Sequence, residues 1–262
     1  MKTRAPFSVL YQDNDIVVLN KAAGLSVAAD RWDPDAPRLD TAAASVCRPG
    51  ERLYAVHRID RDTSGIVVYA LHSHAHRTLC MAFEHRKVQK TYHALIRGNP
   101  EWETETVSMP LRADGDKMHR TVPDRHGGKS ARTDFRNLGR CGAFSWLEAS
   151  PVTGRTHQIR AHLRLLGFSI ACDALYGSAE PLYLSKIKRS WRGDEFEEKP
   201  LISRLALHAY RLAFPHPESG EPMEFTAPYP RDLHAVRRQF AKLYGTDPLA
   251  CLPDGGGNPS GN

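Results

Sequence analysis

Several features that define other protein classes are missing from this 262-residue chain. No apolar run approaches the roughly 18 residues that a membrane-spanning helix needs, and residues 1–6 do not form the apolar segment of a secretory signal. The five cysteines are scattered, odd in number and without a Cys-x-x-Cys pair, which argues against a disulfide framework or a cysteine zinc site. We therefore expect a cytoplasmic protein with reduced thiols and no membrane partner.

The composition is that of an ordinary globular protein. Hydrophobic residues make up 41% of the chain and charged residues 25%. A chain of this length can bury a sizeable core as one large domain or two small ones. The net charge of +6 favours a polyanionic partner such as nucleic acid, provided that the basic residues cluster.

Alternating and β-branched segments, mixed with helical patterns, predict an α+β fold. Strands are expected within residues 7–21 on both sides of a turn at 13–15, and at 53–56, 66–71, 90–96, 132–138, 143–149 and 205–214. Helices are expected at 40–46, 73–85, 155–166 and 231–244, the first three capped by Asp40, Ser73 and Thr156. Residues 112–132 are predicted to be a polar loop, 181–204 an insertion, and 253–262 a disordered tail.

A charged loop at residues 57–65, between two apolar runs, is the strongest candidate for a functional site. It reads His-Arg-Ile-Asp-Arg-Asp-Thr-Ser-Gly. A loop carried by a rigid sheet can expose a reactive group and still hold it in place. The alternative is a charged surface turn, with Asp62 as a capping residue and Gly65 as a turn residue. The loop alone does not decide between the two.

The loop resembles the signature of the RluA family of pseudouridine synthases, which is His-Arg-(Leu/Ile)-Asp, two variable residues, and Thr-Ser-Gly. Other segments resemble family motifs in the same order, at 10–27, 90–94, 128–133, 154–160, 207–209 and 225–228. Two departures are Ala22, where the family usually has proline, and Cys172, where it commonly has glycine before Asp173. Several motifs in the right order are far more specific than one short pattern.

The resemblance implies a mixed, mainly antiparallel sheet with a central catalytic cleft, in a catalytic domain covering residues 7–245. It implies isomerisation of uridine to pseudouridine in RNA, without a cofactor or a metal. Because the first strand is expected near residue 7, we expect no separate N-terminal RNA-binding domain. Family members of that kind modify a tRNA anticodon stem-loop, large-subunit rRNA, or both. We expect a monomer with RNA as its partner and no obligatory protein partner.

The resemblance also assigns roles to individual residues. Asp60 is implied to be the catalytic carboxylate, which either attacks C1′ or removes a ribose proton. It has to be ionised, and a nearby guanidinium, implied to be Arg160, offsets the cost of burying its charge. Tyr92 is implied to stack on the uracil and to assist proton removal at C5. Arg58 is implied to fill the space left by the flipped base. The other candidates for substrate contact are His57, Thr63, Lys129, Arg155, His157 and Gln158.

Less specific interpretations exist for these residues. Arg160 fits a solvated helix residue or a phosphate contact, and Tyr92 fits ordinary packing. The loop 112–132 and a basic helix face of His157, Arg160 and Arg164 are candidates for binding the RNA backbone, or are solvated surfaces.

Two other functions compete with the synthase. A non-catalytic RNA-binding module would not need Asp60, Tyr92 and Arg160 together. A metal-dependent hydrolase is a weaker rival, because the side chains of His72, His74 and His76 need not converge, and His157 and His162 are not spaced as a zinc pair.

Overall fold

The computed structural model describes residues 5–29, 35–48 and 52–250. The strands are β1 (Phe7–Gln12), β2 (Ile16–Lys21), β3 (Tyr54–Ala55), β4 (Ser64–Ala70), β5 (Gln89–Arg97), β6 (Thr104–Ser108), β7 (Leu111–Arg112), β8 (Val122–Pro123), β9 (Arg132–Cys141), β10 (Phe144–Pro151), β11 (Ser169–Ile170), β12 (Leu207–Pro215) and β13 (Pro222–Thr226). The helices are α1 (Leu39–Ala42), the 3₁₀ turn η1 (Ala44–Val46), α2 (Ser73–Glu84), α3 (Gln158–Leu165) and α4 (Arg231–Tyr244).

Eleven strands form one mixed sheet. Its order is β1-β2-β4-β12-β5-β10-β9-β6, with β3, β13 and β11 pairing to β4, β12 and β5. Among the described strands only β12 and β4 pair in parallel, whereas the other pairs are antiparallel. The predicted α+β class with a mainly antiparallel sheet is confirmed.

The strands β2 and β4 are apolar along their whole length because both of their faces are buried. Ile16, Val18, Ile66 and Val68 pack with α2 on one face, and the alternate residues of the same strands pack with α1 on the other. Successive side chains of a strand point to opposite faces, so burial on both sides requires a continuous apolar run.

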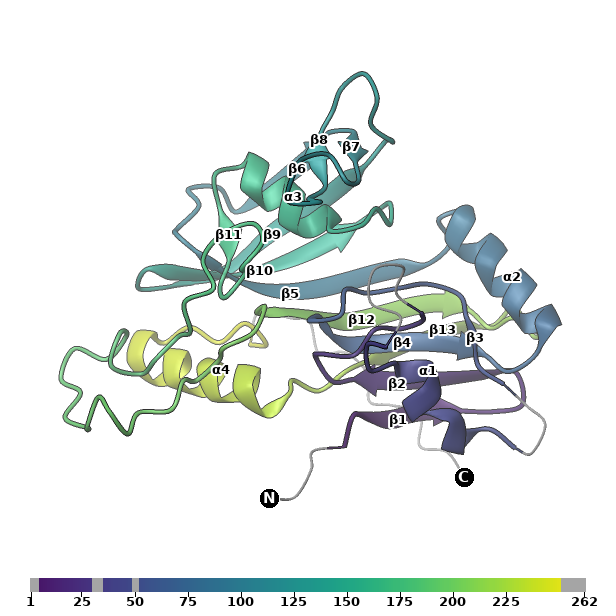
Figure 1. Cartoon of the computed structure of the whole chain (residues 1–262), viewed down its shortest axis with the longest axis horizontal. Helices are drawn as coiled ribbons and strands as arrows, with labels where there is room; N and C mark the ends of the chain where they lie inside the picture. The colour runs from purple at the N-terminus through teal and green to yellow at the C-terminus, as the bar shows by residue number, and fades with distance from the viewer. Residues whose placement is uncertain (1–4, 30–34, 49–51, 251–262) are drawn as a thin grey trace.

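The sheet has two halves that meet at β4 and β12, with β5 running through the middle of the molecule in Figure 1. The parallel pairing places His208 opposite Ser64 and Ala209 opposite Gly65. Gly65 has φ +115°, and a Cβ atom added there would lie 2.2 Å from the carbonyl oxygen of Ala209. Only glycine permits this approach. The joint comes directly after the charged loop, so that loop ends where the two halves meet.

The predicted helix starts need correction. Arg38 rather than Asp40 precedes α1, which is short and followed by a separate 3₁₀ turn. His72 rather than Ser73 caps α2, and its Nδ1 atom accepts the Ala75 N–H at 3.3 Å. The prediction for α4 is confirmed at both ends.

The helix α3 begins at Gln158 and not at residue 155, and Thr156 does not cap it. His157 occupies the N-cap position in the left-handed conformation, with φ 51°.

The structure also tests the predictions for two long segments. Residues 112–132 are not loop throughout, because β7 and β8 form a small hairpin there. Residues 181–204 lie between β11 and β12 and, within the described chain, contain turns and no helix or regular strand. The predicted tail at 253–262 lies outside the described residues. No described helix combines the length and apolarity that crossing a membrane requires.

Candidate active site

The loop after β3 holds Asp60 at the edge of a cavity. Its neighbour Ile59 is buried in the core, and the Asp60 carbonyl accepts the Thr63 N–H at 3.1 Å, which closes a tight turn. Neighbouring side chains of the loop therefore point in opposite directions, with Ile59 anchored in the core and Asp60 directed outward. The Asp60 side chain retains 23% exposure, so a substrate can reach it.

The cavity has a volume of about 500 Å³. Strand β5, the end of α2, the loop 57–63 and the turn 151–160 form its walls. All three residues implied to be catalytic, Asp60, Tyr92 and Arg160, line it. A smaller cavity of about 240 Å³ lies against the same loop and shares Asp60 as a lining residue.

Arg160 joins Asp60 to a second carboxylate that the sequence analysis did not assign to the site. Its Nη1 donates to Asp60 Oδ2 at 3.0 Å. Its Nε and Nη2 donate to the two oxygens of Asp173, each at 2.9 Å. The arginine side chain is 10% exposed and that of Asp173 is fully buried. The interpretation of Arg160 as a solvated helix residue is therefore wrong.

The contacts of Arg160 fix its charge and its direction. Burial lowers its pKa, but the hydrogen bonds that it donates to Asp173 and the charges of both carboxylates outweigh burial and raise the pKa well above its usual value. The guanidinium lies 4.9 Å from the Tyr176 ring centroid. No described residue donates a hydrogen bond to Asp60 Oδ1, so the bond from Arg160 leaves that oxygen available to a substrate.

Tyr92 lies on β5 and packs against both sheet halves at the cavity wall. Burial and the charge of Asp60 raise its pKa well above the usual value. The phenol therefore stays protonated at neutral pH, and it cannot accept a proton from C5 before it loses its own. This favours ring packing over direct action as a base.

Two candidates for substrate contact have polar atoms that the protein itself uses. The amide oxygen of Gln158 accepts from Thr153 Oγ1 and the Arg155 N–H, and its nitrogen donates to the Arg132 carbonyl and Thr133 Oγ1. An amide has no further capacity, so Gln158 has no polar atom to spare for a substrate. It does line the cavity, and its contact with a substrate stays a prediction.

His57 is tied to the sheet. Its Nε2 accepts the Val68 N–H at 3.1 Å, and its ring stacks on Phe83. Burial, together with the charge of Lys90, lowers the pKa of His57 to about 3, so this imidazole is neutral at neutral pH.

The other predicted residues differ in their access to a substrate. Thr63 lines the cavity, and its Oγ1 atom is buried without a hydrogen-bond partner within the described part of the chain. The exposed residues Arg58 and Arg155 line both cavities. His157 also lines both, with its Nε2 4.0 Å from Asp60 Oδ2 and its Nδ1 3.2 Å from the Tyr176 hydroxyl. Lys129 is exposed and does not line either cavity.

The predicted basic face of α3 does not form. Arg160 turns inward to the two carboxylates, whereas Arg164 is exposed. The basic loop is partly neutralised by its own acids, because Arg112 pairs with Asp124 and Arg120 with Asp116. Lys117, Arg125 and Lys129 of this loop are exposed, and the binding of the RNA backbone by the loop stays a prediction.

A buried lysine, which the sequence analysis did not assign to the site, anchors the loop 57–63 by hydrogen bonds. The Lys21 side chain donates to three backbone carbonyls, those of Ala22, Leu25 and Arg61, at 2.8 to 3.0 Å. Burial lowers its pKa to about 7, against the raising effect of Asp62 and Asp60. Its bond to Arg61 joins the end of β2 to the residue after Asp60. The sequence marked Lys21 only as part of an opening motif.

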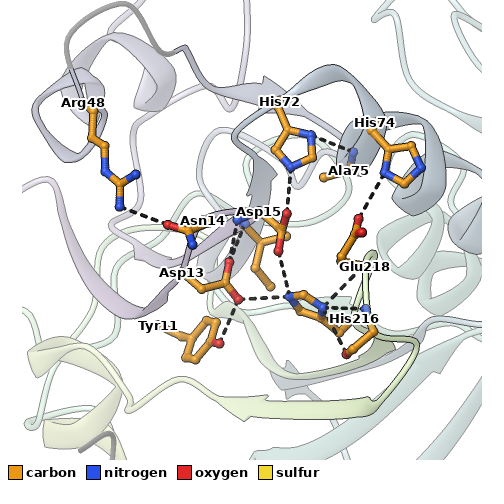
Figure 2. Close-up of polar contacts among 12 residues, drawn as sticks. Tyr11, Asp13, Asn14, Asp15, Arg48, His72, His74, Ala75, His216 and Glu218 are labelled. Atoms are coloured by element: carbon orange, nitrogen blue, oxygen red, sulfur yellow. Dashed lines mark hydrogen bonds and ion pairs between the residues drawn. The ribbon is translucent and has the colours of Figure 1, made fainter.

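Figure 2 shows His72 facing Asp15 and His74 facing Glu218, whereas His76 contacts the Ala55 carbonyl. The same view shows His216 beside Asp13 and Asp15, three groups whose ligand atoms lie within 4.8 Å of one another. His216 Nδ1 accepts from the Glu218 and Ser219 N–H groups. The ring proton is therefore on Nε2, the atom that would have to bind a metal. The arrangement fits a hydrogen-bonded turn better than a metal site.

Comparison with known proteins agrees with this geometry. The family model described as RNA pseudouridylate synthase matches residues 15–165, a range that includes Asp60, Tyr92 and Arg160. The chain belongs to the RNA pseudouridylate synthase family, which confirms the resemblance to RluA-type enzymes.

Three relatives illustrate the range of similarity. An uncharacterized RNA pseudouridine synthase of Chloroflexus aurantiacus is 42% identical, over 77% of this chain and 56% of its own length. Ribosomal large subunit pseudouridine synthase D of Neisseria meningitidis serogroup B is 36% identical, over 86% of this chain and 59% of its own. The solved structure of human RNA pseudouridylate synthase domain containing 1 is 28% identical with a TM-score of 0.65, covering 88% of this chain and 87% of that one. The chain thus spans little more than half the length of the first two relatives.

Proposed function

We propose that this protein isomerises specific uridines of RNA to pseudouridine, with Asp60 as the catalytic carboxylate. The observation that carries the proposal is the Asp60–Arg160–Asp173 arrangement at the wall of a cavity that Tyr92 also lines. Large-subunit rRNA is the proposed substrate, because similar proteins are named ribosomal large subunit pseudouridine synthases C and D. A tRNA anticodon stem-loop is a second candidate, taken from the family resemblance. We propose a cytoplasmic monomer that needs no protein partner.

The proposed reaction needs four changes at the nucleotide. The N1–C1′ bond breaks, the base turns, the C5–C1′ bond forms, and C5 loses a proton while N1 gains one. No electrons are exchanged with a second reactant, so the isomerisation needs no redox cofactor. Asp60 either attacks C1′ as the N1–C1′ bond breaks and is displaced when C5 bonds to C1′, or removes a ribose proton and returns it as the C5–C1′ bond forms. In both cases its unbonded oxygen, Oδ1, faces the reacting sugar. Arg160 supplies a fixed positive charge 3.0 Å from this carboxylate.

The uridine has to leave its stack before it can enter the cavity. Flipping a base costs a few kcal/mol, and we propose that Arg58, which is exposed at the mouth of both cavities, occupies the vacated space. The Tyr92 ring then packs on the uracil.

The test is pseudouridine mapping, by carbodiimide-stop sequencing, of total RNA from cells with and without the gene. Complementation with the wild type, Asp60→Asn and Asp62→Asn separates the two loop carboxylates. We expect a uridine position in rRNA or tRNA that loses its mark without the gene, regains it with the wild type and Asp62→Asn, and stays unmodified with Asp60→Asn. Phosphate contacts carry most RNA affinity, so Asp60→Asn protein should still bind RNA.

Three outcomes would contradict the proposal. Full restoration by Asp60→Asn would refute the role of this carboxylate. An RNA that binds the purified wild-type protein, yet is never modified by it, would favour the non-catalytic binding module. Loss of activity in a chelator would favour the metal-dependent alternative.

A further inference from the structure

A lysine side chain lines the cavity, and neither the proposed reaction nor the sequence analysis gives it a role. Lys90 lies on β5 two residues before Tyr92, so both side chains point to the same face of the strand, and both line the cavity. Its Nζ donates to the Thr153 carbonyl at 2.9 Å and would lie 3.8 Å from a Cβ atom placed on Gly154. The ammonium group thus sits against the turn that leads into α3.

The surroundings of this ammonium are positively charged. Burial is the larger cause, and the positive charge of Arg155 the smaller one, of a pKa of Lys90 that is lowered to about 8. Arg58 and Arg86 line the same cavity, as do the neutral His57 and one acid besides Asp60, which is Glu84. Within the described chain no carboxylate forms an ion pair with Lys90, and the Thr153 carbonyl uses one of its three donors.

Arg155 has the same surplus of donors. Its Nε donates to the Ser130 carbonyl at 3.0 Å, which orients the guanidinium, and no described residue accepts from its two Nη groups. Two neighbouring cations at a cavity wall, without a counter-ion, raise the free energy of the empty site. An anion that entered the cavity would lower it and would meet several unused donors.

We propose that Lys90 and Arg155 together bind a phosphodiester of the RNA strand next to the target uridine. This inference rests on the proposed function and names a contact within the same site. The phosphate lies at the Lys90 end of the cavity and the reacting sugar at Asp60, with the Tyr92 ring lining the wall. Lys90 is a substrate-binding residue in this arrangement and takes no part in the transfer of protons.

The experiment measures, by fluorescence anisotropy over a range of KCl concentrations, the binding of a fluorescein-labelled RNA of seven uridines (the U7 RNA). The proteins are the wild type, Lys90→Gln, Lys90→Arg and the control Lys242→Gln, which removes an exposed lysine on α4. Lys90→Gln should weaken binding about ten-fold and make the slope of log K against log[KCl] shallower by about 0.7, the value for one phosphate of a single strand. Lys90→Arg should retain affinity and slope, and Lys242→Gln should match the wild type.

Two further readouts keep the proposal falsifiable if Lys90→Gln is poorly folded. Wild-type affinity for the U7 RNA should fall between pH 7 and pH 9 as Lys90 loses its proton, whereas the affinity of Lys90→Arg should not. Uridine 5′-monophosphate should compete better than uridine against the wild type at pH 7, and this preference should shrink at pH 9 in the wild type but not in Lys90→Arg. An unchanged salt slope in folded Lys90→Gln, or the same pH dependence in wild type and Lys90→Arg, overturns the proposal.

A turnover assay on rRNA and tRNA transcripts separates this proposal from the reaction itself. If no pseudouridine forms but Lys90→Gln lowers affinity and salt slope, the phosphate site is supported and the proposed reaction fails. If pseudouridine forms and Lys90→Gln lowers kcat without changing KM or the salt slope, the reaction is supported and the phosphate site fails.

Discussion

Arg160 organises the site because it contacts two carboxylates at once, Asp60 and Asp173. It donates to both oxygens of Asp173, and Asp173 Oδ1 also accepts the N–H groups of Leu175 and Tyr176. Burying one charge beside one partner is often unfavourable, because desolvation exceeds the attraction. Here two carboxylates and an aromatic face surround one guanidinium. Asp60 therefore meets a partner whose position is fixed before any substrate arrives.

The structure makes a specific prediction for Tyr92. Because its phenol is held in the protonated form, Tyr92→Phe should keep the ring contact and retain kcat within about ten-fold, whereas Tyr92→Ala should lose most activity. Single-turnover measurements on an unmodified transcript would check this. A fall of about 10² to 10⁴-fold in Tyr92→Phe, the range typical of lost acid–base catalysis, would show that the hydroxyl moves a proton.

The sequence pointed to Asp60, Tyr92 and Arg160 through their motifs, but it did not assign Asp173 to the site. The signal was present in the residue before it. Cys172 has φ 59°, a conformation that glycine adopts without strain, and the family commonly places glycine there. The departure marked a turn whose geometry matters. The identity of the partner, thirteen positions from Arg160 in sequence, follows only from the three-dimensional arrangement.

At the scale of elements, the turn between β1 and β2 depends on one carboxylate. Asp13 Oδ1 accepts the N–H groups of Asp15 and Ile16, and Oδ2 accepts from Tyr11 and His216. Burial opposes the charge on Asp13, but these hydrogen bonds outweigh burial and lower the pKa of this carboxyl. The turn joins the edge strand β1 to the buried strand β2.

This lowered pKa predicts a pH-dependent contribution to stability. The contribution is fully present above the unfolded pKa of about 3.9 and is lost as the pH falls through the lower folded value. Asp13→Asn should therefore reduce the free energy of unfolding most above pH 5, and the difference from wild type should shrink below pH 3. Urea denaturation at several pH values measures it, with Glu101→Gln, an exposed carboxylate, as the control. A difference that does not change with pH would contradict the argument.

Strands were easier to predict than helix starts, for a physical reason. Because both faces of β2 and β4 are buried, their sequences are uninterrupted apolar runs that are easy to recognise. Helix starts depend on local backbone geometry, and α3 begins after a left-handed histidine that no cap pattern indicates. The order of strands was equally hidden, because the pairing of β4 with β12 brings together residues 144 positions apart.

At the scale of the whole molecule, the joint between the halves is the most sensitive place for a small change. Gly65→Ala would force its new Cβ against the Ala209 backbone, at a residue whose φ of +115° disfavours any side chain. We expect a loss of stability of about 2 kcal/mol or more, and a larger loss of turnover, because the loop of Asp60 ends at this joint. Thermal unfolding and kcat would check it. Gly220→Ala, at a turn with open space, controls for backbone strain alone, and equal effects of both variants would argue against the role of the joint.

The order of strands in space also has a consequence in time. Strand β12 lies between β4 and β5 although it is made after both. During synthesis, Asp60 and Arg160 leave the ribosome well before the strand that joins their two halves. We therefore expect a growing chain to remain inert toward the RNA of the ribosome that makes it until Pro215 has emerged and the sheet can close.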